Sequence, residues 1–315
     1  MTRVGRSDLD IFPLVLGGNT FGWTSDEAGS WAVLDAFVEQ GGNAIDSADG
    51  YSSWAPGNSG GESETIIGSW MAERGNRDQV VIGTKVSRHP DFLGLAPDTI
   101  RAGADASLKR LQTDYIDLYF AHRDDPTVPL VDTVAAFEEL RATGKIRNVA
   151  VSNYSGERIS EWISIARSNG WPLPVAVQPH YNLVHRQPFE SEIAPILHAD
   201  GLVATPYFAL ASGFLTGKYR VPADVEAATR ADMVGPFFSD DGLVVVDALA
   251  RVAQEHDSAI ATVALAWLTS RPGVVAPIAS ARTPDQLPDL MRSADLRLTA
   301  DDIAALDEAS APFAA

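Results

Sequence analysis

Short runs of β-branched and other apolar residues alternate along the chain with segments whose apolar residues recur at helical spacing. The apolar runs predict eight strands, which begin near Leu14, Asn43, Val80, Ile116, Ile146, Val175, Leu202 and Val274. Helical spacing follows each run, as after Pro97, where Ile100 and Ala104 fall on one face. Repeated alternation of this kind predicts parallel strands joined by crossover helices.

The chain shows no change of composition that would mark a linker, so residues 1–315 are expected to form a single domain. Eight strand and helix units in one domain predict an α/β fold, the (β/α)8 TIM barrel. The alternative is an open doubly wound sheet, which normally carries G-x-G-x-x-G after its first strand. Leu16–Gly22 lacks that spacing. Helices are predicted, among others, at Glu62–Ala72, Glu157–Arg167, Pro188–His198 and Pro284–Met291, and a longer helical region is predicted at Leu243–Ser270.

Two stretches depart from the alternation. Residues 221–242, after the seventh predicted strand, combine two prolines, several acids and little periodicity. A loop of that length in a compact domain is usually a lid or a mobile segment. Near the C-terminus, Thr299 is suited to cap a helix containing Ile303 and Leu306, which predicts one extra C-terminal helix.

Composition narrows the function classes. The chain has no cysteine, which excludes disulfide scaffolds and thiolate chemistry, and 24 Lys and Arg against 42 Asp and Glu give a formal charge of −18. That field repels nucleic acid and anionic membrane surfaces, so any phosphate group must be bound by local donors. The run Ala259–Leu268 is too short to span a membrane, and no secretion signal is evident. A cytoplasmic protein is expected.

Four polar residues lie at or just after predicted strand ends, where a barrel of this type holds its active site. They are Asp46, Tyr51, Lys85 and His122. Each alone has an ordinary structural explanation, as a loop cap, a packed ring, a surface charge or a hydrogen-bonded histidine. Together they follow three successive strands and are expected to meet at one mouth of the barrel.

Longer segments around these residues resemble the aldo-keto reductase family, over nearly the whole chain. The resemblance is carried by Gly42–Tyr51, Gly61–Glu64, Lys85, Leu108–Leu111, Asp114–His122 and Gly144–Asn153. It implies that Asp46, Tyr51, Lys85 and His122 form the catalytic tetrad of a carbonyl reductase.

The chemistry explains why those residue types are needed together. Hydride addition to a carbonyl leaves an alkoxide that must be protonated, and a free tyrosine with a pKa near 10 is a weak acid. A neighbouring ammonium favours the phenolate and lowers that pKa. The resemblance therefore assigns Tyr51 as general acid and Lys85 as the group that adjusts it. It also assigns Asp46 to keep Lys85 charged, and His122 to donate to the carbonyl oxygen.

The resemblance also implies a nicotinamide cofactor held at the barrel mouth. Ser152, Asn153 and Gln178 are expected at its carboxamide, and Tyr207 is expected to stack on the nicotinamide ring. The expected pyrophosphate contacts are Leu210, Ser212, Gly213, Leu215, Gly217 and Lys218, and those to the adenosine phosphate are Ser280, Arg282 and Gln286. An arginine near a helix N-terminus favours binding of a 2′-phosphate, so NADPH is expected as the cofactor and NADH is the alternative. The alternative for the segment Leu210–Lys218 is a plain turn, and the alternative for Arg282 is a surface residue that binds no phosphate.

The sequence departs from the family pattern at Ala279, Ser280 and Leu290, which bears on cofactor affinity rather than on the fold. Trp23 and Trp54 are expected to wall the substrate pocket or merely to pack. The expected function is reversible, NADPH-dependent reduction of a small aldehyde or ketone.

Two alternatives stay open. The first is a regulatory cofactor-binding protein with little turnover, since the family includes potassium-channel β-subunits. The second is another barrel enzyme, a lyase or a metal-dependent hydrolase. His180, His185 and His198 show no metal-ligand motif, and no metal is expected.

Overall fold

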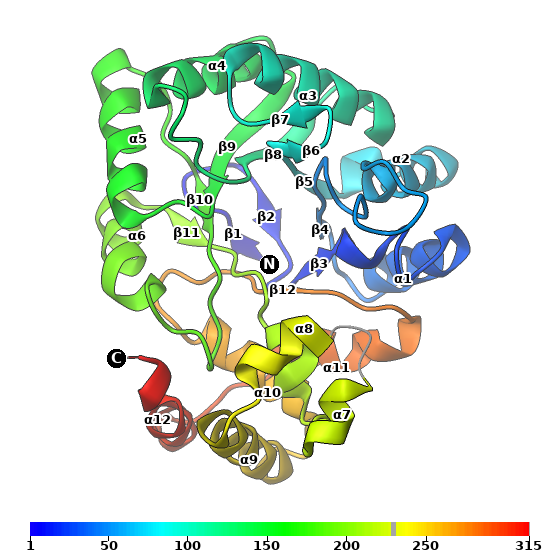
Figure 1. Ribbon diagram of the computed structural model, residues 1–315, viewed down its shortest axis with the longest axis vertical. Helices are drawn as coiled ribbons and strands as arrows, with labels where there is room; N and C mark the ends of the chain where they lie inside the picture. The colour runs from blue at the N-terminus through cyan, green and yellow to red at the C-terminus, as the bar shows by residue number, and fades with distance from the viewer. Residues whose placement is uncertain (228–230, 315) are drawn as a thin grey trace.

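Eight parallel strands form a closed ring at the centre of the protein, in a computed structural model that describes residues 1–227 and 231–314 (Figure 1). The strands are β3 (Val15–Gly17), β4 (Ala44–Asp46), β5 (Val81–Val86), β8 (Ile116–Ala121), β9 (Ile146–Ser152), β10 (Ala176–Gln178), β11 (Val203–Ala204) and β12 (Ile278–Ala279). Ile278 pairs with Val15, and a parallel bridge joins Ala204 to Val274. These contacts close the ring, so the predicted (β/α)8 barrel is confirmed.

Helices cover the outside of the ring (Figure 1). The α-helices are α1 (Glu27–Glu39), α2 (Glu62–Arg74), α3 (Pro97–Leu111), α4 (Leu130–Ala142), α5 (Gly156–Asn169), α6 (Ala194–Asp200), α9 (Asp240–Glu255), α10 (Ile260–Thr269), α11 (Leu287–Met291) and α12 (Ala300–Ala309). In α3, Pro97 occupies the first turn, and Ile100, Ala104 and Leu108 are buried against the barrel. Thr299 caps α12 as expected and also forms a capping box with Asp302, so the predicted C-terminal helix is confirmed.

A hairpin of β1 (Thr2–Arg3) and β2 (Asp10–Ile11) lies across one end of the ring, paler behind the barrel in Figure 1. Val4, Leu9 and Ile11 are buried there against residues inside the barrel, including Leu118 and Phe120. The sequence pattern did not predict this hairpin, because two-residue strands carry too little periodicity to detect. The hairpin closes the end opposite to the strand ends that carry the polar residues.

The helical region predicted at Leu243–Ser270 is confirmed, but it is not continuous. It is two helices, α9 and α10, and Asp257 between them has a φ of +46°, which no α-helix accommodates. The predicted helix Pro188–His198 begins with a π-helical turn, Phe189–Ile193, before α6. The predicted helix Pro284–Met291 starts as a 3₁₀ turn, Pro284–Gln286.

The segment 221–242 is more ordered than a plain loop. It contains α7 (Pro222–Glu226), α8 (Ala231–Val234), a 3₁₀ turn at Gly235–Phe237 and the start of α9. Residues 228–230, which fall within this expectation, lie outside the described residues. Its role as a lid stays a prediction.

Short elements complete the chain. A second hairpin pairs β6 (Arg88–His89) with β7 (Phe92–Leu93), and further 3₁₀ turns lie at Gly18–Thr20, Arg77–Gln79, Ala211–Thr216, Arg292–Ala294 and Ala311–Phe313. Within the described residues, none of the helices combines the length and apolarity that crossing a membrane requires.

Candidate active site

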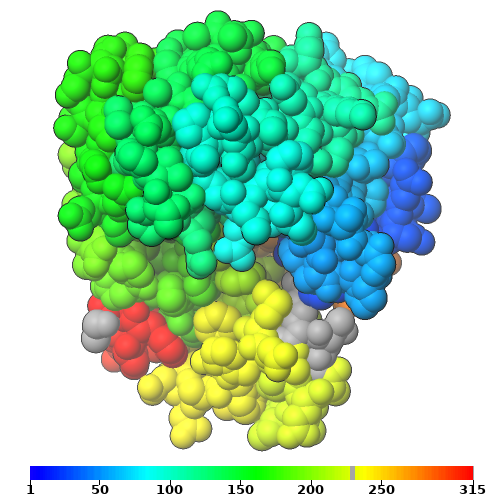
Figure 2. All heavy atoms as spheres, turned by 45° about the horizontal axis from the view of Figure 1, so that its top comes forward, coloured from blue at the N-terminus to red at the C-terminus, as the bar shows by residue number. Residues whose placement is uncertain are grey.

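A cavity of about 1310 Å³ opens at the carboxyl ends of the barrel strands. Figure 2 shows the surface hollowed between the blue-to-cyan part of the chain and the yellow part. Of the expected site residues, those that line it are Trp23, Asp46, Tyr51, Trp54, His122, Ser152, Asn153, Gln178, Tyr207, Leu210, Ser212, Gly213, Lys218, Ser280, Arg282 and Gln286. Most residues selected from separate parts of the sequence therefore meet at one cavity.

Lys85 lies beneath the cavity floor, fully buried, and joins three groups. Its Nζ donates to Asp46 Oδ2 at 2.7 Å, to the Ser47 carbonyl at 2.6 Å and to Tyr51 Oη at 2.9 Å. Tyr51 Oη also lies 3.1 Å from Asp46 Oδ2. The pairing of β4 with β5 sets Asp46 beside Gly83, so the lysine and the carboxylate come from adjacent strands at one level. The structure thus brings three of the four expected catalytic residues into direct contact.

Gln178, at the end of β10, extends this hydrogen-bond network across the barrel to Asp46. Its Nε2 donates to Asp46 Oδ1 at 2.8 Å, so both carboxylate oxygens of Asp46 are hydrogen-bonded. Gln178 was expected only as a cofactor contact. In this structure its amide also orients the carboxylate that faces Lys85.

Burial shifts the pKa values of both Tyr51 and Lys85. It raises the pKa of the Tyr51 hydroxyl well above its usual value, and the Asp46 charge adds to that rise. Burial also lowers the pKa of Lys85, while Asp46 opposes the change. The sequence led us to expect the ammonium to lower the pKa of Tyr51. Burial and Asp46 act in the other direction, and the net result is a hydroxyl that keeps its proton at neutral pH.

His122 lies beside Tyr51, with their ring centroids 6.2 Å apart. Burial, and then the charge of Lys85, lower the pKa of the imidazole well below its usual value, so the ring is neutral at pH 7. Its Nδ1 is buried and has no hydrogen-bond partner within residues 1–227 and 231–314. A neutral imidazole carries one N–H, and because Nδ1 is enclosed, only the other ring nitrogen could present it to a ligand in the cavity that His122 lines.

A row of polar contacts runs from His122 along the neighbouring strand ends. Asn153 Nδ2 donates to the His122 carbonyl at 2.9 Å and to Ser152 Oγ at 3.0 Å, and Tyr207 Oη donates to Asn153 Oδ1 at 2.7 Å. Ser152 Oγ in turn donates to the Gln178 carbonyl at 2.9 Å. These four expected cofactor contacts are one connected group in the structure.

The turn Ala211–Thr216 and the residues after it form another side of the cavity. Ser212 and Gly213 have φ angles of +57° and +96°, so both lie in the left-handed region, which glycine adopts freely. Ser212 Oγ is buried without a hydrogen-bond partner in the part of the chain that the structure describes. Leu215 is fully buried, and neither it nor Gly217 is a lining residue. The structure does not place these last two in the cavity.

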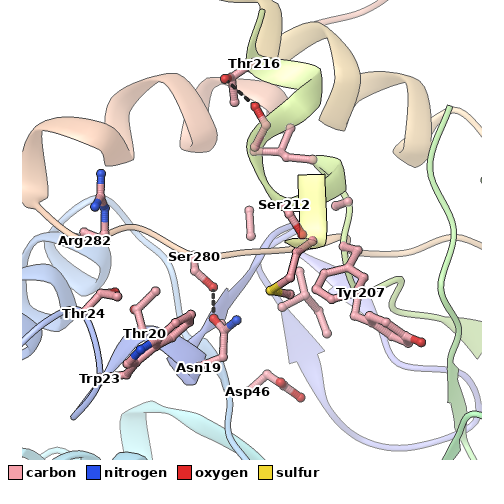
Figure 3. A pocket seen from close by; sticks show the side chains of 18 of the residues that line it. Asn19, Thr20, Trp23, Thr24, Asp46, Tyr207, Ser212, Thr216, Ser280 and Arg282 are labelled. Atoms are coloured by element: carbon pink, nitrogen blue, oxygen red, sulfur yellow. Dashed lines mark hydrogen bonds between the residues drawn. The ribbon is translucent and has the colours of Figure 1, made fainter. Parts of the chain in front are cut away.

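The segment after β12 forms the end of the cavity that carries Arg282 (Figure 3). Ser280 Oγ donates to Asn19 Oδ1 at 2.6 Å, and the Gln286 side chain accepts from the backbone N–H of Arg282 at 2.8 Å. The Arg282 side chain is exposed and makes no ion pair with the described residues. Two carboxylates, Asp285 and Asp289, line the same end.

Two tryptophans lie at the rim near Tyr51. The rings of Trp23 and Trp54 meet edge to face at 5.5 Å, and Trp54 lies 6.2 Å from Tyr51. Trp54 is 51% exposed, which is unusual for so large an apolar ring. The arrangement fits a wall that a substrate would cover.

The sequence reading missed two groups at this site. Arg88 and Arg123 line the cavity, and Arg123 could have been found because it directly follows His122.

The buried carboxyls Asp49 and Glu64 lie behind the tetrad. Glu64 is paired with Arg110 at 2.7 Å, whereas burial and then Glu64 raise the pKa of Asp49 to about 7.

Comparisons with known proteins agree with this architecture. The model of the aldo/keto reductase family matches residues 13–311. The chain is 34% identical to "Protein tas" of Escherichia coli, over 97% of this chain and 96% of that protein. It is 34% identical to the "Probable voltage-gated potassium channel subunit beta" of rice, over 93% and 90%. It is 32% identical to the "Uncharacterized oxidoreductase YrpG" of Bacillus subtilis, over 94% and 91%. On these grounds, the chain belongs to the aldo/keto reductase family.

Proposed function

We propose that the protein is an oxidoreductase that reduces a small aldehyde or ketone to the alcohol with NADPH. The observation that carries the proposal is the Tyr51 hydroxyl, which lies 2.9 Å from the Lys85 ammonium at the floor of the cavity, beside His122. An acid that can hand a proton to a bound oxygen, beside a cation that can stabilise the anion it leaves, suits carbonyl reduction.

The residues around the cavity fit a nicotinamide dinucleotide. The cavity exceeds the range of about 300 to 1,000 Å³ that is usual for small-molecule sites, so it has room for a cofactor together with a substrate. The buried, unpartnered Ser212 Oγ and the Lys218 ammonium, which lies 3.1 Å from where a Cβ on Gly213 would be, offer polar and charged groups to a phosphate. Tyr207 and the linked group Ser152, Asn153 and Gln178 would hold the nicotinamide end. When bound, the cofactor would supply the hydride that adds to the carbonyl carbon.

The chain's own residues would perform the remaining steps. The His122 N–H and the Tyr51 hydroxyl would donate hydrogen bonds to the carbonyl oxygen and fix its position. The Tyr51 proton would then pass to that oxygen as negative charge develops on it. Lys85 would stabilise the resulting phenolate, and Asp46 would keep Lys85 charged in spite of its burial. In alcohol oxidation the phenolate would act as the base.

The preference for NADPH rests on Arg282. Its guanidinium is exposed at the far end of the cavity and is not paired with any described carboxylate, which suits it to a 2′-phosphate. The carboxylates of Asp285 and Asp289, which line the same end, would repel this 2′-phosphate. The proposed NADPH preference requires that the guanidinium outweigh them.

A second candidate function is regulatory cofactor binding with little turnover. It is favoured by the 34% identity to the protein named as a potassium channel subunit beta. Turnover separates the two functions, because both require the cofactor to bind.

The test is a fluorescence titration of the purified protein with NADPH and with NADH, followed by an aromatic aldehyde while the nicotinamide absorbance is recorded. We expect tighter binding of NADPH and its oxidation after the aldehyde is added. Binding without oxidation across several carbonyl compounds would support the regulatory function instead, and no binding would contradict both.

A further inference from the structure

We propose that Arg88 and Arg123 form a recognition site for an anionic group on the carbonyl substrate. The inference rests on the proposed function and adds the substrate class, an aldehyde or ketone that also carries a carboxylate or a phosphate. It depends on residues that the sequence reading did not select.

The backbone brings the two arginines to the same rim. Strands β5 and β8 are paired, with Val86 beside Ala121. Arg88 and Arg123 each lie two positions beyond these paired residues, so they leave adjacent strands at the same level. Arg123 directly follows His122 in the chain.

Both arginines face the cavity that contains Tyr51 and His122. They also line a smaller adjoining cavity of about 380 Å³, together with Ser87, Leu93, Gly94 and two carboxylates, Asp124 and Asp125. Their charges contribute to the low pKa of the His122 imidazole, after burial and Lys85, which indicates that both reach this side of the site. The carbonyl end of a substrate and the two guanidinium groups would therefore be neighbours.

Neither guanidinium is neutralised by the part of the protein that the structure describes. Arg88 and Arg123 are exposed and make no side-chain hydrogen bond or ion pair with a described residue. In a chain with 42 acids against 24 bases, most arginines are paired with a carboxylate. Two adjacent unpaired ones at the rim of an active site are therefore unusual for this molecule.

The carboxylates nearest to this rim are engaged elsewhere. Asp124 binds Arg158 through two bonds of 2.8 and 2.9 Å. Asp125 accepts from the backbone N–H groups of Leu95 and Thr127 and from the Thr127 hydroxyl at 2.6 Å. Both acids are fixed by other partners, so the guanidinium groups remain available to a ligand.

The position distinguishes this site from the one proposed for the cofactor phosphate. Arg282 follows β12, and in the ring β12 is separated from β5 by β3 and β4. The planar guanidinium binds carboxylate and phosphate oxygens through paired hydrogen bonds. An anion on the substrate would orient the molecule with its carbonyl group toward Tyr51.

The test compares matched pairs of aldehydes in NADPH oxidation. One pair is 4-carboxybenzaldehyde and its methyl ester, and the other is glyceraldehyde 3-phosphate and glyceraldehyde. We expect kcat/KM to be at least about tenfold higher for the charged member of one pair, which also identifies carboxylate or phosphate as the anion. The ratio should fall as salt is added.

Arg88→Gln and Arg123→Gln should each lower the ratio of kcat/KM for the charged aldehyde to that for its neutral partner toward one. Arg251→Gln is the matched control, because Arg251 is exposed on α9 and lines neither cavity, and it should leave the ratio unchanged. Equal or better use of the neutral member of both pairs would overturn this inference and leave the proposed function standing. No oxidation with any of the four aldehydes would overturn both.

Discussion

The two sides of the cavity are built in different ways. On the side of β4, β5 and β8, Lys85 and Asp46 are buried and each of their polar atoms is hydrogen-bonded across neighbouring strands. On the side of the turn Ala211–Thr216 and the segment after β12, Lys218 and Arg282 are exposed and the backbone turns through left-handed residues. Around Lys85 the first side, which we call the fixed side, holds atoms in place, although Arg88 and Arg123 at its rim are unpaired. The second, which we call the adjustable side, leaves Lys218 and Arg282 exposed to a ligand.

Strand length follows the same division. On the first side β5 and β8 have 6 residues each and β4 has 3, and the neighbouring β9 has 7, whereas β11 and β12 have 2 each. Proton transfer requires groups held within a fraction of an ångström, which long paired strands can supply. A binding loop gains from adjustment, and loops on a rigid scaffold commonly carry binding residues. The protein therefore holds Lys85 and Asp46 on paired strands and presents its binding residues, Arg88 and Arg123 included, from the segments that follow the strands.

Replacing Tyr51 by phenylalanine should have the largest effect. The ring stays in place, but the proton donor is lost, so kcat should fall by about 10²- to 10⁴-fold while the Kd for NADPH stays within twofold. Stopped-flow reduction and a fluorescence titration measure the two quantities. Tyr115→Phe is the matched control, since Tyr115 lies just before β8, at the end away from His122. Turnover of Tyr51→Phe near the wild-type level would show that the fixed side does not perform the chemistry.

A pH comparison tests how strongly the fixed side is desolvated. Asp49 has a pKa of about 7 in the folded protein against 3.8 for the unfolded chain, chiefly because it is buried. Between pH 3.8 and pH 7 the Asp49 carboxyl is therefore protonated in the folded protein and ionised in the unfolded chain. The stability from this group is therefore complete below pH 3.8 and is lost as pH rises through 7. Asp49→Asn should accordingly gain about 3 kcal/mol in unfolding free energy relative to wild type between pH 5 and pH 8.

Urea unfolding at pH 5 and pH 8 measures this change. Asp301→Asn, at an exposed position on α12, is the control and should show no such pH-dependent difference. If Asp49→Asn and Asp301→Asn behaved alike, Asp49 would be ionised throughout and the interior behind Lys85 would be better solvated than its burial indicates.

Replacing Arg282 by alanine should have the smallest of these effects. Loss of one exposed charge-assisted contact should raise the Kd for NADPH about tenfold and leave that for NADH nearly unchanged. Arg297→Ala removes an exposed arginine that lies outside the cavity and serves as control. Equal losses for both cofactors would place the 2′-phosphate elsewhere on the adjustable side.

The sequence predicted the fixed side more closely than the adjustable side. The strands Ile116–Ala121 and Ile146–Ser152 begin at the expected residues, because apolar runs of six or seven residues between turns give a strong signal. The last strand was expected to begin near Val274 but is Ile278–Ala279, since only a single bridge at Val274 joins the earlier residues to the ring. Short strands depend on tertiary contacts that periodicity does not report.

The same limit applies to the site. Residues at strand ends could be predicted because the barrel brings all strand ends together. The second role of Gln178, as donor to Asp46, could not be predicted, since it depends on a contact between residues 132 positions apart. Nor could the buried state of Asp49 or the free guanidinium of Arg88, because burial and missing partners are properties of the packed molecule.

The seam of the barrel has a consequence for protein synthesis. Val15 in β3 finds its neighbour, Ile278, only after nearly the whole chain has left the ribosome, while β5, β8 and β9 can pair much earlier. Contacts between such distant residues carry the greatest cost in chain entropy. Until they form, the nascent protein is an open curved sheet with two unpaired edges, which are the surfaces most prone to wrong association. Wrong association through these edges is therefore most favoured in the interval before β12 emerges.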